Sequence, residues 1–242
     1  MSEQVARLRS ATKYYGKKKV LDNIDIELST GKILGLIGPS GSGKTTTIKC
    51  LMGMEKLDKG YAQIFDTEIP DRKILNEIGY MGQSDALYES LTAWENLVFF
   101  GNLMGLDGKQ LKQAIDKNMK LVHLENELNN IVNTFSGGMK RRLSLAITLL
   151  ANPNLIILDE PTVGIDPSLR RDIWKQLNNL TAHGKSVIIT THVMGEAERC
   201  DYIGLIVEGR LFTMGTPQEL KKKFNVTSIE EVFIKAESEV QT

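Results

Sequence analysis

The stretch from Ile33 to Met52 reads ILGLIGPSGSGKTTTIKCLM. Its first residues are apolar and predict a buried strand, whereas the residues from Lys44 onward predict a helix. The residues that join them, Gly38–Thr45, match the pattern G-x-x-x-x-G-K-[S/T]. In this pattern the glycines let the chain turn tightly, so that consecutive backbone N–H groups face a polyphosphate at the start of the helix. The stretch therefore predicts a site for nucleotide phosphates.

The side chains of this loop have separate predicted tasks. Lys44 is expected to reach the β- and γ-phosphates of the nucleotide, and the Thr45 hydroxyl to coordinate Mg²⁺. A Gly-rich turn that only caps a helix is the alternative, and the strand-loop-helix context argues against it. The residues predicted to surround the nucleotide are Gly38, Pro39, Ser40, Gly41, Ser42, Gly43, Lys44, Thr45 and Thr46.

A second apolar strand, Leu155–Leu158, ends in the two carboxylates Asp159 and Glu160. By itself this is an ordinary strand end with two solvated acids. Together with a phosphate loop, it predicts that Asp159 holds Mg²⁺ and that Glu160 polarises the attacking water as a general base. Adjacent residues of a strand point to opposite sides, so the two acids can serve different roles.

The run Ser136-Gly137-Gly138 begins a predicted helix. A helix start of this composition offers N–H groups, a hydroxyl and no bulky side chain to a phosphate. Ser and Gly are also ordinary capping residues, so by itself the run is better interpreted as a simple N-cap.

The order of the predicted elements indicates an α/β fold. Continuously apolar strands alternate with helical segments, as expected for a mainly parallel sheet covered by helices. Two strands are predicted ahead of the phosphate loop, at residues 5–12 and 20–28. Residues 87–150 predict an inserted helical lobe that includes a capping box at Thr92 and Glu95. We expect one domain over 1–242, with its core at 1–86 and 151–223, the lobe at 87–150 and a tail at 224–242.

Composition narrows the class of protein further. The chain has 242 residues, and its 30 Lys and Arg balance 30 Asp and Glu, which argues against a general nucleic-acid binder. The basic runs 17–19, 140–142 and 221–223 are interpreted as solvated faces. Cys50 and Cys200 have no metal-ligand spacing, which favours a reducing compartment. The polar start Met1–Gln4 predicts no secretory signal, and the apolar runs are too short to cross a bilayer.

The phosphate loop, the helical insertion with Ser136-Gly137-Gly138, and the strand ending in Leu-Asp-Glu-Pro together resemble the nucleotide-binding subunits of ATP-binding cassette (ABC) transporters. The resemblance extends from Val5 to about Leu220, and it implies a P-loop NTPase core (RecA-like) with an N-terminal antiparallel β subdomain and the inserted helical lobe. It implies that Ser136, Gly137 and Gly138 form the signature loop, which binds the γ-phosphate of an ATP held by the opposite subunit. The implied unit is a head-to-tail dimer with two ATP molecules at its interface.

The resemblance also implies roles for single residues. Tyr15 would stack on the adenine, with Tyr14 as its nearest competitor and a buried strand-end tyrosine as the alternative. Gln83 would link the core to the helical lobe and sense the metal and the γ-phosphate. Asp166 would lie in the loop that crosses the dimer interface, and His192 would be the switch histidine.

Three shorter stretches resemble the ATPase subunits of two-component bacterial exporters of drugs, antibiotics and lipids: 139–142, 164–167 and 215–217. Phe135 and Met139 depart from the usual Leu and Gln of the signature, which affects the dimer contact rather than ATP binding. The resemblance implies an ATP-hydrolysing subunit that forms a homodimer on binding ATP. This dimer would drive export by a separate polytopic membrane subunit. It would act at the cytoplasmic face of the membrane and bind no nucleic acid. The coupling surface is expected where 83–92 meets the helical lobe.

Four apolar side chains of the lobe have two possible roles. They either line a groove for a helix of the membrane partner or form the core of the lobe, and for any single residue the core is the better interpretation. They are Trp94, Phe99, Phe100 and Met104.

Other functions remain as alternatives. A soluble ABC-type ATPase that acts on ribosomes or DNA usually carries two cassettes or long coiled-coil insertions, and this chain has one cassette and an insertion of ordinary size. A kinase or GTPase would leave Ser136 unexplained, and no Asn-Lys-x-Asp motif is present. A regulatory subunit without activity is disfavoured because Lys44, Asp159, Glu160 and His192 are all present.

Overall fold

The computed structural model describes residues 3–240. The outermost residues of the predicted polar start and of the predicted tail, 1–2 and 241–242, lie outside the described part. The chain divides into two compact units, a first unit of Met1–Ile74 with Ser186–Thr242 and a second unit of Leu75–Lys185. The predicted boundaries of the core, the lobe and the tail differ from this division and stay predictions.

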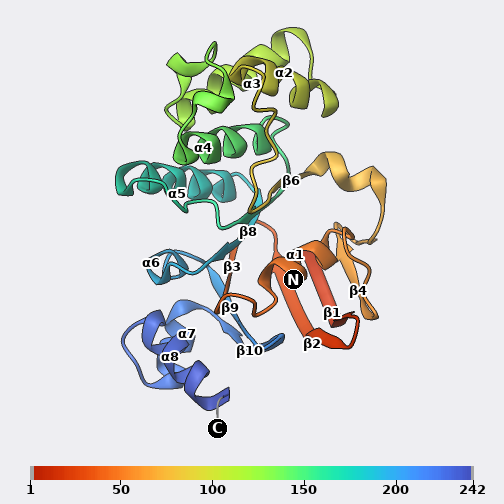
Figure 1. Cartoon of the computed structure of the whole chain (residues 1–242). Coiled ribbons are helices and arrows are strands. Elements are labelled where there is room, and N and C mark those ends of the chain that lie inside the picture. The colour runs from red at the N-terminus through yellow and green to blue at the C-terminus, as the bar shows by residue number, and fades with distance from the viewer. Residues whose placement is uncertain (1–2, 241–242) are drawn as a thin grey trace. The chain divides into compact units, whose positions relative to one another are not determined.

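An antiparallel sheet forms the N-terminal part of the first unit (Figure 1). Strands β1 (Gln4–Tyr15) and β2 (Lys18–Ser29) form a hairpin, and β4 (Lys59–Ile64) pairs with the other edge of β1. The short strand β5 (Thr67–Glu68) completes the order β2-β1-β4-β5. Gly16, at φ +60°, makes the hairpin turn, because this left-handed conformation is readily adopted by glycine. The predicted antiparallel subdomain is confirmed.

The first unit also contains the phosphate-loop strand in parallel pairing. Strand β3 (Ile33–Ile37) pairs in parallel with β8 (Ser186–Thr191) on one side and with β9 (Tyr202–Val207) on the other. Every residue of β3 and β8 is buried, which explains why both sequences are continuously apolar or small. Strand β10 (Arg210–Gly215) pairs antiparallel with β9, and the two strands form a hairpin.

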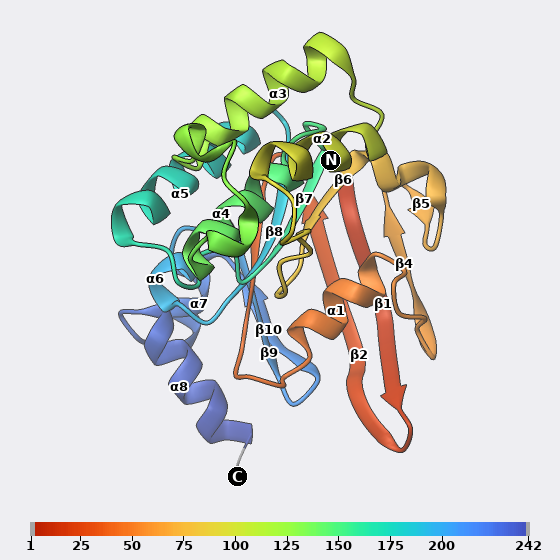
Figure 2. The same ribbon diagram turned by 45° about the horizontal axis from the view of Figure 1, so that its top comes forward.

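Four helices belong to the first unit. Helix α1 (Lys44–Leu51) follows the Gly-rich loop directly and contacts β1, β2 and β4 (Figure 2). The short α6 (Met194–Ala197) follows β8. Helices α7 (Pro217–Phe224) and α8 (Ile229–Val240) pack on each other after β10. Helix α7 has Pro217 in its first turn and a capping box at Thr216 and Glu219.

The second unit holds the carboxylate-bearing strand. Strand β7 (Leu155–Asp159) is buried along its whole length and pairs in parallel with β6 (Ile78–Met81). Helix α5 (Pro167–Ala182) follows β7 and buries Leu169, Ile173, Trp174 and Leu177, which recur at helical spacing. The 3₁₀ segment Arg72–Glu77 leads into β6. With the parallel strands of both units and the antiparallel sheet, the predicted α/β class is confirmed.

The remaining helices of the second unit are α2 (Ala93–Leu103), α3 (Gly108–Leu121) and α4 (Gly137–Thr148), which contact one another. The 3₁₀ turns Glu125–Glu127 and Val132–Thr134 lie between α3 and α4. The capping box of α2 is confirmed, and its geometry is close to ideal. The backbone N–H of Glu95 donates to Oγ1 of Thr92 over 3.1 Å, and the N–H of Thr92 donates to Oε2 of Glu95 over 2.8 Å.

Helix α2 corrects one interpretation. Trp94 and Phe99 are 36% and 43% exposed, so the interpretation as core is wrong for these two side chains. Phe100 and Met104 are half-buried. The reason is geometric, because the helical spacing places four non-aromatic residues on the buried face of α2, whereas Trp94 and Phe99 fall on the other face. The four are Ala93, Asn96, Leu97 and Gly101.

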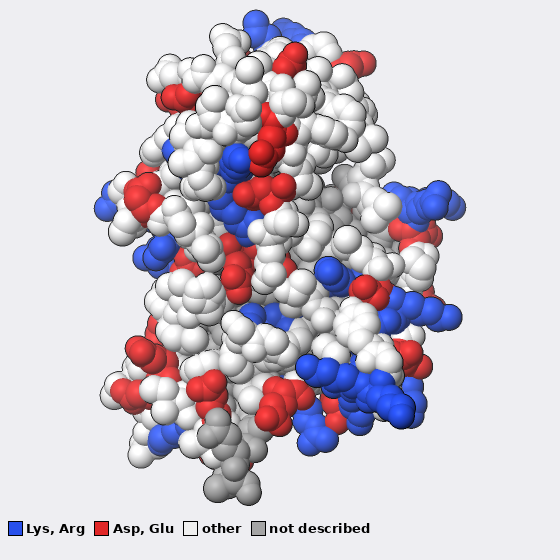
Figure 3. Space-filling view, viewed as in Figure 1, with Lys and Arg blue, Asp and Glu red and all other residues white. Residues whose placement is uncertain are grey.

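The three basic runs behave differently. Lys17, Lys18 and Lys19 are exposed, and Figure 3 shows blue side chains gathered over the turn end of the β1–β2 hairpin. In 221–223, Lys222 and Lys223 are exposed as expected. The run 140–142 was interpreted wrongly as a solvated face, since one of its members, Arg141, is only 6% exposed.

Within residues 3–240, no helix combines the length and the apolar character that crossing a membrane requires. Cys50 and Cys200 are both buried and carry free thiols. Burial raises the pKa of the Cys50 thiol to about 11, so this thiol is protonated near neutral pH.

Candidate active site

The Gly-rich loop of the first unit lies between β3 and α1 and is packed closely against its surroundings. A Cβ atom placed on Gly38 would lie 2.0 Å from the carbonyl oxygen of Ile206, so no larger residue fits there. Gly41 and Gly43 have φ angles of +76° and +109°, which other residues rarely adopt. The glycines of the pattern are therefore required by the backbone itself.

Lys44 is folded back over this loop. Its side chain is buried, and Nζ donates to the carbonyl oxygens of Gly38 over 2.8 Å and of Pro39 over 2.9 Å. The hydroxyl of Ser42 is also buried and has no hydrogen-bond partner among the described residues. A buried hydroxyl without a partner among the described residues fits an oxygen-rich anion, which would satisfy it, and the Lys44 ammonium group beside it is a donor of the charge that such an anion prefers.

The end of β1 presents two tyrosines. Tyr15 is 45% exposed and Tyr14 is 36% exposed, so the alternative of a buried strand-end tyrosine is wrong. The Nζ atoms of Lys13 and Lys19 lie 5.2 Å and 5.9 Å from the ring centroids of Tyr15 and Tyr14, respectively. Both rings are accessible for stacking, and the choice of Tyr15 for the adenine stays a prediction.

In the second unit, β7 ends at two acids in different environments. Asp159 is fully buried, whereas Glu160 is half-buried. Glu160 has φ +54°, a left-handed conformation that costs a non-glycine residue about 1–3 kcal/mol. The chain thus turns sharply at Glu160 instead of continuing the strand, which fits different roles for the two acids.

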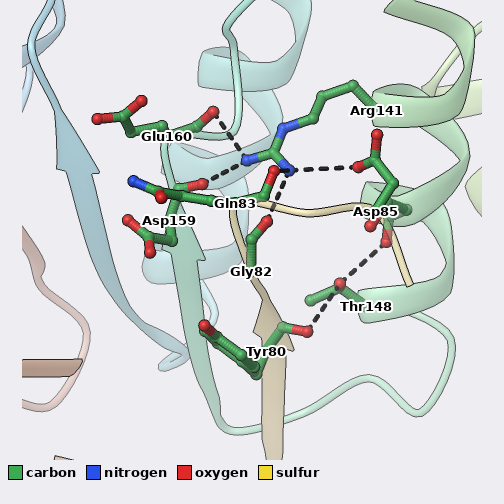
Figure 4. A network of polar contacts seen from close by, with 9 residues as sticks. Tyr80, Gly82, Gln83, Asp85, Arg141, Thr148, Asp159 and Glu160 are labelled. Atoms are coloured by element: carbon green, nitrogen blue, oxygen red, sulfur yellow. Dashed lines mark hydrogen bonds and ion pairs between the residues drawn. The ribbon is translucent and has the colours of Figure 1, made fainter. Parts of the chain in front are cut away.

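Arg141, on the first turns of α4, connects two segments of the second unit (Figure 4). Its Nη1 atom donates to the carbonyl oxygens of Gly82 over 2.6 Å and of Gln83 over 3.1 Å, and to Oδ1 of Asp85 over 3.2 Å. Its Nη2 atom donates to the carbonyl oxygens at the end of β7, including that of Glu160 over 2.9 Å. The segment after β6 and the end of β7 are therefore held by one side chain.

Sequence reasoning missed this residue, although a signal was present. Arg141, Leu145 and Thr148 are all buried and follow one another at helical spacing, so Arg141 lies on the buried face of α4. The pattern alone does not show that a cation on this face meets backbone carbonyls from two distant segments.

A pocket of about 500 Å³ lies in the second unit. It brings together several of the predicted residues, the signature glycines and the predicted base among them. Its lining consists of Gln83, Asp85, Gly137, Gly138, Arg141, Glu160, Val163 and Gly164.

The start of α4 forms one side of this pocket. Oγ of Ser136 accepts a hydrogen bond from the backbone N–H of Met139 over 3.2 Å, so the N-cap interpretation is confirmed. A Cβ atom on Gly138 would lie 2.9 Å from the carbonyl oxygen of Gly164, whereas one on Gly137 would meet nothing within 4 Å. Phe135 is buried, which explains how a bulky residue fits at the first signature position.

Asp166 caps α5. Its Oδ1 atom accepts from the hydroxyl of Ser168 over 2.6 Å and from the backbone N–H groups of Ser168 and Leu169 over 3.1 Å and 3.0 Å. The hydrogen bond from the Ser168 hydroxyl, followed by the backbone N–H groups, lowers the pKa of this carboxyl. A capping role is thus visible, and the predicted role at a dimer interface stays a prediction.

His192 follows β8 in the first unit and is exposed. The backbone on either side is fixed by a buried pair, in which Oγ1 of Thr191 donates to Oε2 of Glu196 over 2.7 Å. The same hydroxyl accepts from the N–H of Val193 over 3.0 Å. The turn therefore presents His192 from an ordered backbone.

Comparison with known proteins decides the family. The ABC transporter family matches residues 21–163. The chain belongs to this family. The chain is similar to Nod factor export ATP-binding protein I of Cupriavidus metallidurans, with 38% identity over 219 residues, 89% of this chain and 72% of that protein. It is also similar to a probable multidrug ABC transporter ATP-binding protein of Escherichia coli, with 36% identity over 221 residues. This alignment covers 90% of this chain but only 38% of that protein.

Solved structures of ABC transporter proteins have the same fold. The structure of an ATP binding subunit of an ABC transporter matches 96% of this chain and 99% of its own, with a TM-score of 0.89 and 26% identity. A bacterial ABC transporter cassette solved as a dimer matches 87% of this chain and 98% of its own, with a TM-score of 0.81 and 26% identity. The predicted family and fold are confirmed. The chain is an ABC-type ATPase that binds ATP. The alternatives of a kinase and of a GTPase are excluded.

The predicted metal ligands of this ABC ATPase are all oxygen donors, the hydroxyl of Thr45, the side-chain amide of Gln83 and the carboxylate of Asp159. Oxygen donors suit a hard cation such as Mg²⁺, which takes few protein ligands and fills its shell with phosphate oxygens and water. Within the described residues, no group of three or more His, Cys, Asp or Glu is arranged to hold a metal ion. The donor set fits Mg²⁺ brought in with the nucleotide.

Proposed function

We propose that this chain hydrolyses MgATP and uses the reaction to drive a separate membrane subunit of an exporter. The observation that carries the proposal is the pocket of the second unit, in which Gln83, Glu160 and the signature residues Gly137 and Gly138 line one space. A phosphate loop without such a pocket would support nucleotide binding only.

The residues divide the task of hydrolysis. The loop 38–46 binds the phosphates through backbone N–H groups and Lys44, and Tyr15 stacks on the adenine. Thr45, Asp159 and Gln83 would hold Mg²⁺, which would neutralise phosphate charge when bound. Glu160 accepts the proton of the attacking water, and His192 orients the γ-phosphate end of the site.

Two copies of the chain act together, as a head-to-tail dimer. The start of α4 supports this, because Ser136 and Gly137 are exposed and a side chain at Gly137 would meet nothing within 4 Å. Such an open helix start suits a γ-phosphate held by a second subunit. The relative solved as a dimer supports the same assembly. Asp166 lies in the loop proposed to cross the interface.

An aromatic patch on the second unit supports a membrane partner. It consists of Tyr88, Phe99 and Phe100. The ring centroids of Tyr88 and Phe99 are 4.9 Å apart, and those of Phe99 and Phe100 are 5.2 Å apart. Exposed apolar side chains that cluster in this way are typical of a docking surface, here for a helix of the membrane subunit. The chain is thereby held at the cytoplasmic face of the membrane.

The names of the relatives support export. They describe Nod factor export and multidrug transport. A soluble ABC-type ATPase that acts on ribosomes or DNA is the second candidate, and the neutral net charge of the chain disfavours it.

The role of Glu160 is tested by Glu160→Gln, which keeps the shape but removes the base. Loss of a general base lowers turnover by about 100- to 10,000-fold. We expect the variant to bind ATP and to accumulate as an ATP-bound dimer, measured by ATPase assay and size-exclusion chromatography with ATP. Normal turnover in this variant would remove Glu160 from the role of base.

The membrane partner is tested by purifying the tagged chain from native membranes in mild detergent. A polytopic membrane protein recovered in stoichiometric amount supports the proposal, and its loss in Phe99→Glu places it on the aromatic patch. Ile234→Glu, at an exposed apolar position of α8, is the matched control. Recovery of ribosomes, DNA or only soluble protein would leave the ATPase in place and overturn the transport function.

A further inference from the structure

We propose that Arg141 is a positioning residue for hydrolysis, which holds the backbones of Gln83 and Glu160 in their active conformation from the signature helix. The proposal rests on the proposed role of Glu160 as the base. It assigns to α4 a second task besides presenting Ser136 and Gly137.

The guanidinium is buried and pairs almost entirely with backbone. Four of its hydrogen bonds go to carbonyl oxygens, and one goes to the carboxylate of Asp85. A buried cation is costly to keep unless its surroundings are satisfied by hydrogen bonds. Here the guanidinium meets one carboxylate and four backbone carbonyls. This arrangement is more than a simple ion pair, because it fixes the geometry of the backbone.

At the end of β7, Nη2 bonds the two carbonyls on either side of the Glu160 α-carbon, those of Asp159 and Glu160. The φ and ψ angles of Glu160 determine how these two peptide planes are oriented relative to each other. One nitrogen atom therefore holds both planes at the residue that has the left-handed φ of +54°. Without this pair of bonds, Glu160 is expected to relax to a more favourable backbone conformation and to move its carboxylate.

Nη1 makes the same arrangement at Gln83. It bonds the carbonyls of Gly82 and Gln83, which lie on either side of the Gln83 α-carbon. The two nitrogens of one planar group thus define the backbone of two predicted active-site residues. Figure 4 shows both segments facing the guanidinium.

A lysine cannot reproduce this arrangement. Its ammonium group is a single point of charge, whereas the planar guanidinium presents donors in two directions at once. Arg142, the next residue, is a matched control. Its Nη1 donates to the carbonyls of Val122 and His123 over 3.1 Å and 3.3 Å, neither of which lines the pocket.

The test compares Arg141→Lys with Arg142→Lys in the full chain, by steady-state ATPase kinetics and by equilibrium ATP binding. Misplacing a catalytic group by about 1 Å costs up to about 100-fold in rate, so we expect kcat to fall at least about tenfold in Arg141→Lys. ATP affinity should stay near the wild-type value, because every described hydrogen bond of Arg141 is to residues outside the phosphate loop. Arg142→Lys should retain kcat.

Two results would overturn the proposal. One is an Arg141→Lys variant whose kcat equals that of Arg142→Lys. The other is a fall in ATP affinity that accounts for the whole loss, which would make Arg141 part of nucleotide binding. Neither result bears on the proposed function, which fails instead if the wild-type chain does not hydrolyse ATP or if Glu160→Gln turns over normally.

A second pair of variants covers the case in which Arg141→Lys does not fold. Asp85→Asn removes the countercharge that orients the guanidinium, at a side chain that is 22% exposed. Its kcat should fall by a smaller factor than in Arg141→Lys, with ATP affinity retained. Glu89→Gln is the control, because Glu89 pairs with Lys140 at 2.6 Å and does not contact Arg141. Equal kcat in Asp85→Asn and Glu89→Gln would overturn the proposal.

Discussion

The starts of α1 and α4 are both suited to phosphate, yet they are built in opposite ways. Before α1, the loop is enclosed by its own chain, with Gly38 packed against Ile206 and with Lys44 buried against loop carbonyls. Before α4, Ser136 and Gly137 are exposed, and a Cβ atom on Gly137 would meet nothing within 4 Å. Both use the N-terminal end of a helix, where the backbone favours negative charge.

The difference indicates which helix start binds ATP and which one joins two subunits. The enclosed loop of α1 supplies the cation, the tight turns and the N–H groups from one chain, so it can bind a nucleotide alone. In the proposed function, the open start of α4 supplies only half of a site, and its ligand is presented by the second subunit. Affinity for ATP should therefore depend on the first helix start, and the association of two subunits on the second.

The largest expected effect breaks the enclosed site. Lys44→Ala removes the buried ammonium group. A hydrogen bond to a charged group contributes about 1.5–3 kcal/mol, so its loss should weaken ATP binding by up to about 100-fold. Hydrolysis should be lost as well. Lys49→Ala, in the last turn of the same helix, is the control, and ATP titration of the monomer is the measurement. Unchanged affinity in Lys44→Ala would mean that the nucleotide binds elsewhere.

The next effect separates the two helix starts. Ser136→Arg places a long side chain in the open start of α4, so the second subunit cannot bring its ATP there. Hydrolysis and ATP-dependent dimerisation should be abolished, while the monomer keeps an ATP affinity close to that of the wild type. Chromatography with ATP and titration at low protein concentration measure the two properties. A collapse of monomer affinity would place Ser136 in the same site as Lys44.

The smallest effect concerns stability and compares neighbouring glycines. An added methyl group at Gly138 meets the carbonyl oxygen of Gly164 at 2.9 Å, and overpacking of this kind costs about 1–3 kcal/mol. For a chain of this size, each kcal/mol lowers Tm by about 2–4 °C. Gly137→Ala, which meets nothing, should keep Tm near the wild-type value. Equal shifts in thermal denaturation would contradict the contrast between the two positions.

The elements that the sequence predicted well are those with a strong local pattern. The strands at 33–37 and 155–158 are continuously apolar because they are buried on both faces, and that signal is contained in a few adjacent residues. The caps at Thr92 and Ser136 are equally local. The antiparallel strand β4 was not predicted, because only two of its residues, Ala62 and Ile64, are buried and it contains a glycine.

What the sequence could not give depends on contacts between distant segments. The burial of Arg141 follows from carbonyls that lie 18 or more positions away along the chain. The left-handed backbone of Glu160 is likewise invisible in its residue type, since Glu has no preference for that conformation. The loop chemistry of Gly38–Thr45 was predictable because its pattern carries its own geometry.

The turn that carries His192 has a consequence for mutagenesis. The buried hydroxyl of Thr191 joins the carboxylate of Glu196 to the backbone N–H of Val193, so the backbone around His192 is held by its neighbours along the chain. A substitution that removes this hydroxyl, such as Thr191→Val, breaks both hydrogen bonds. It would therefore disturb the position of His192 without changing the imidazole itself.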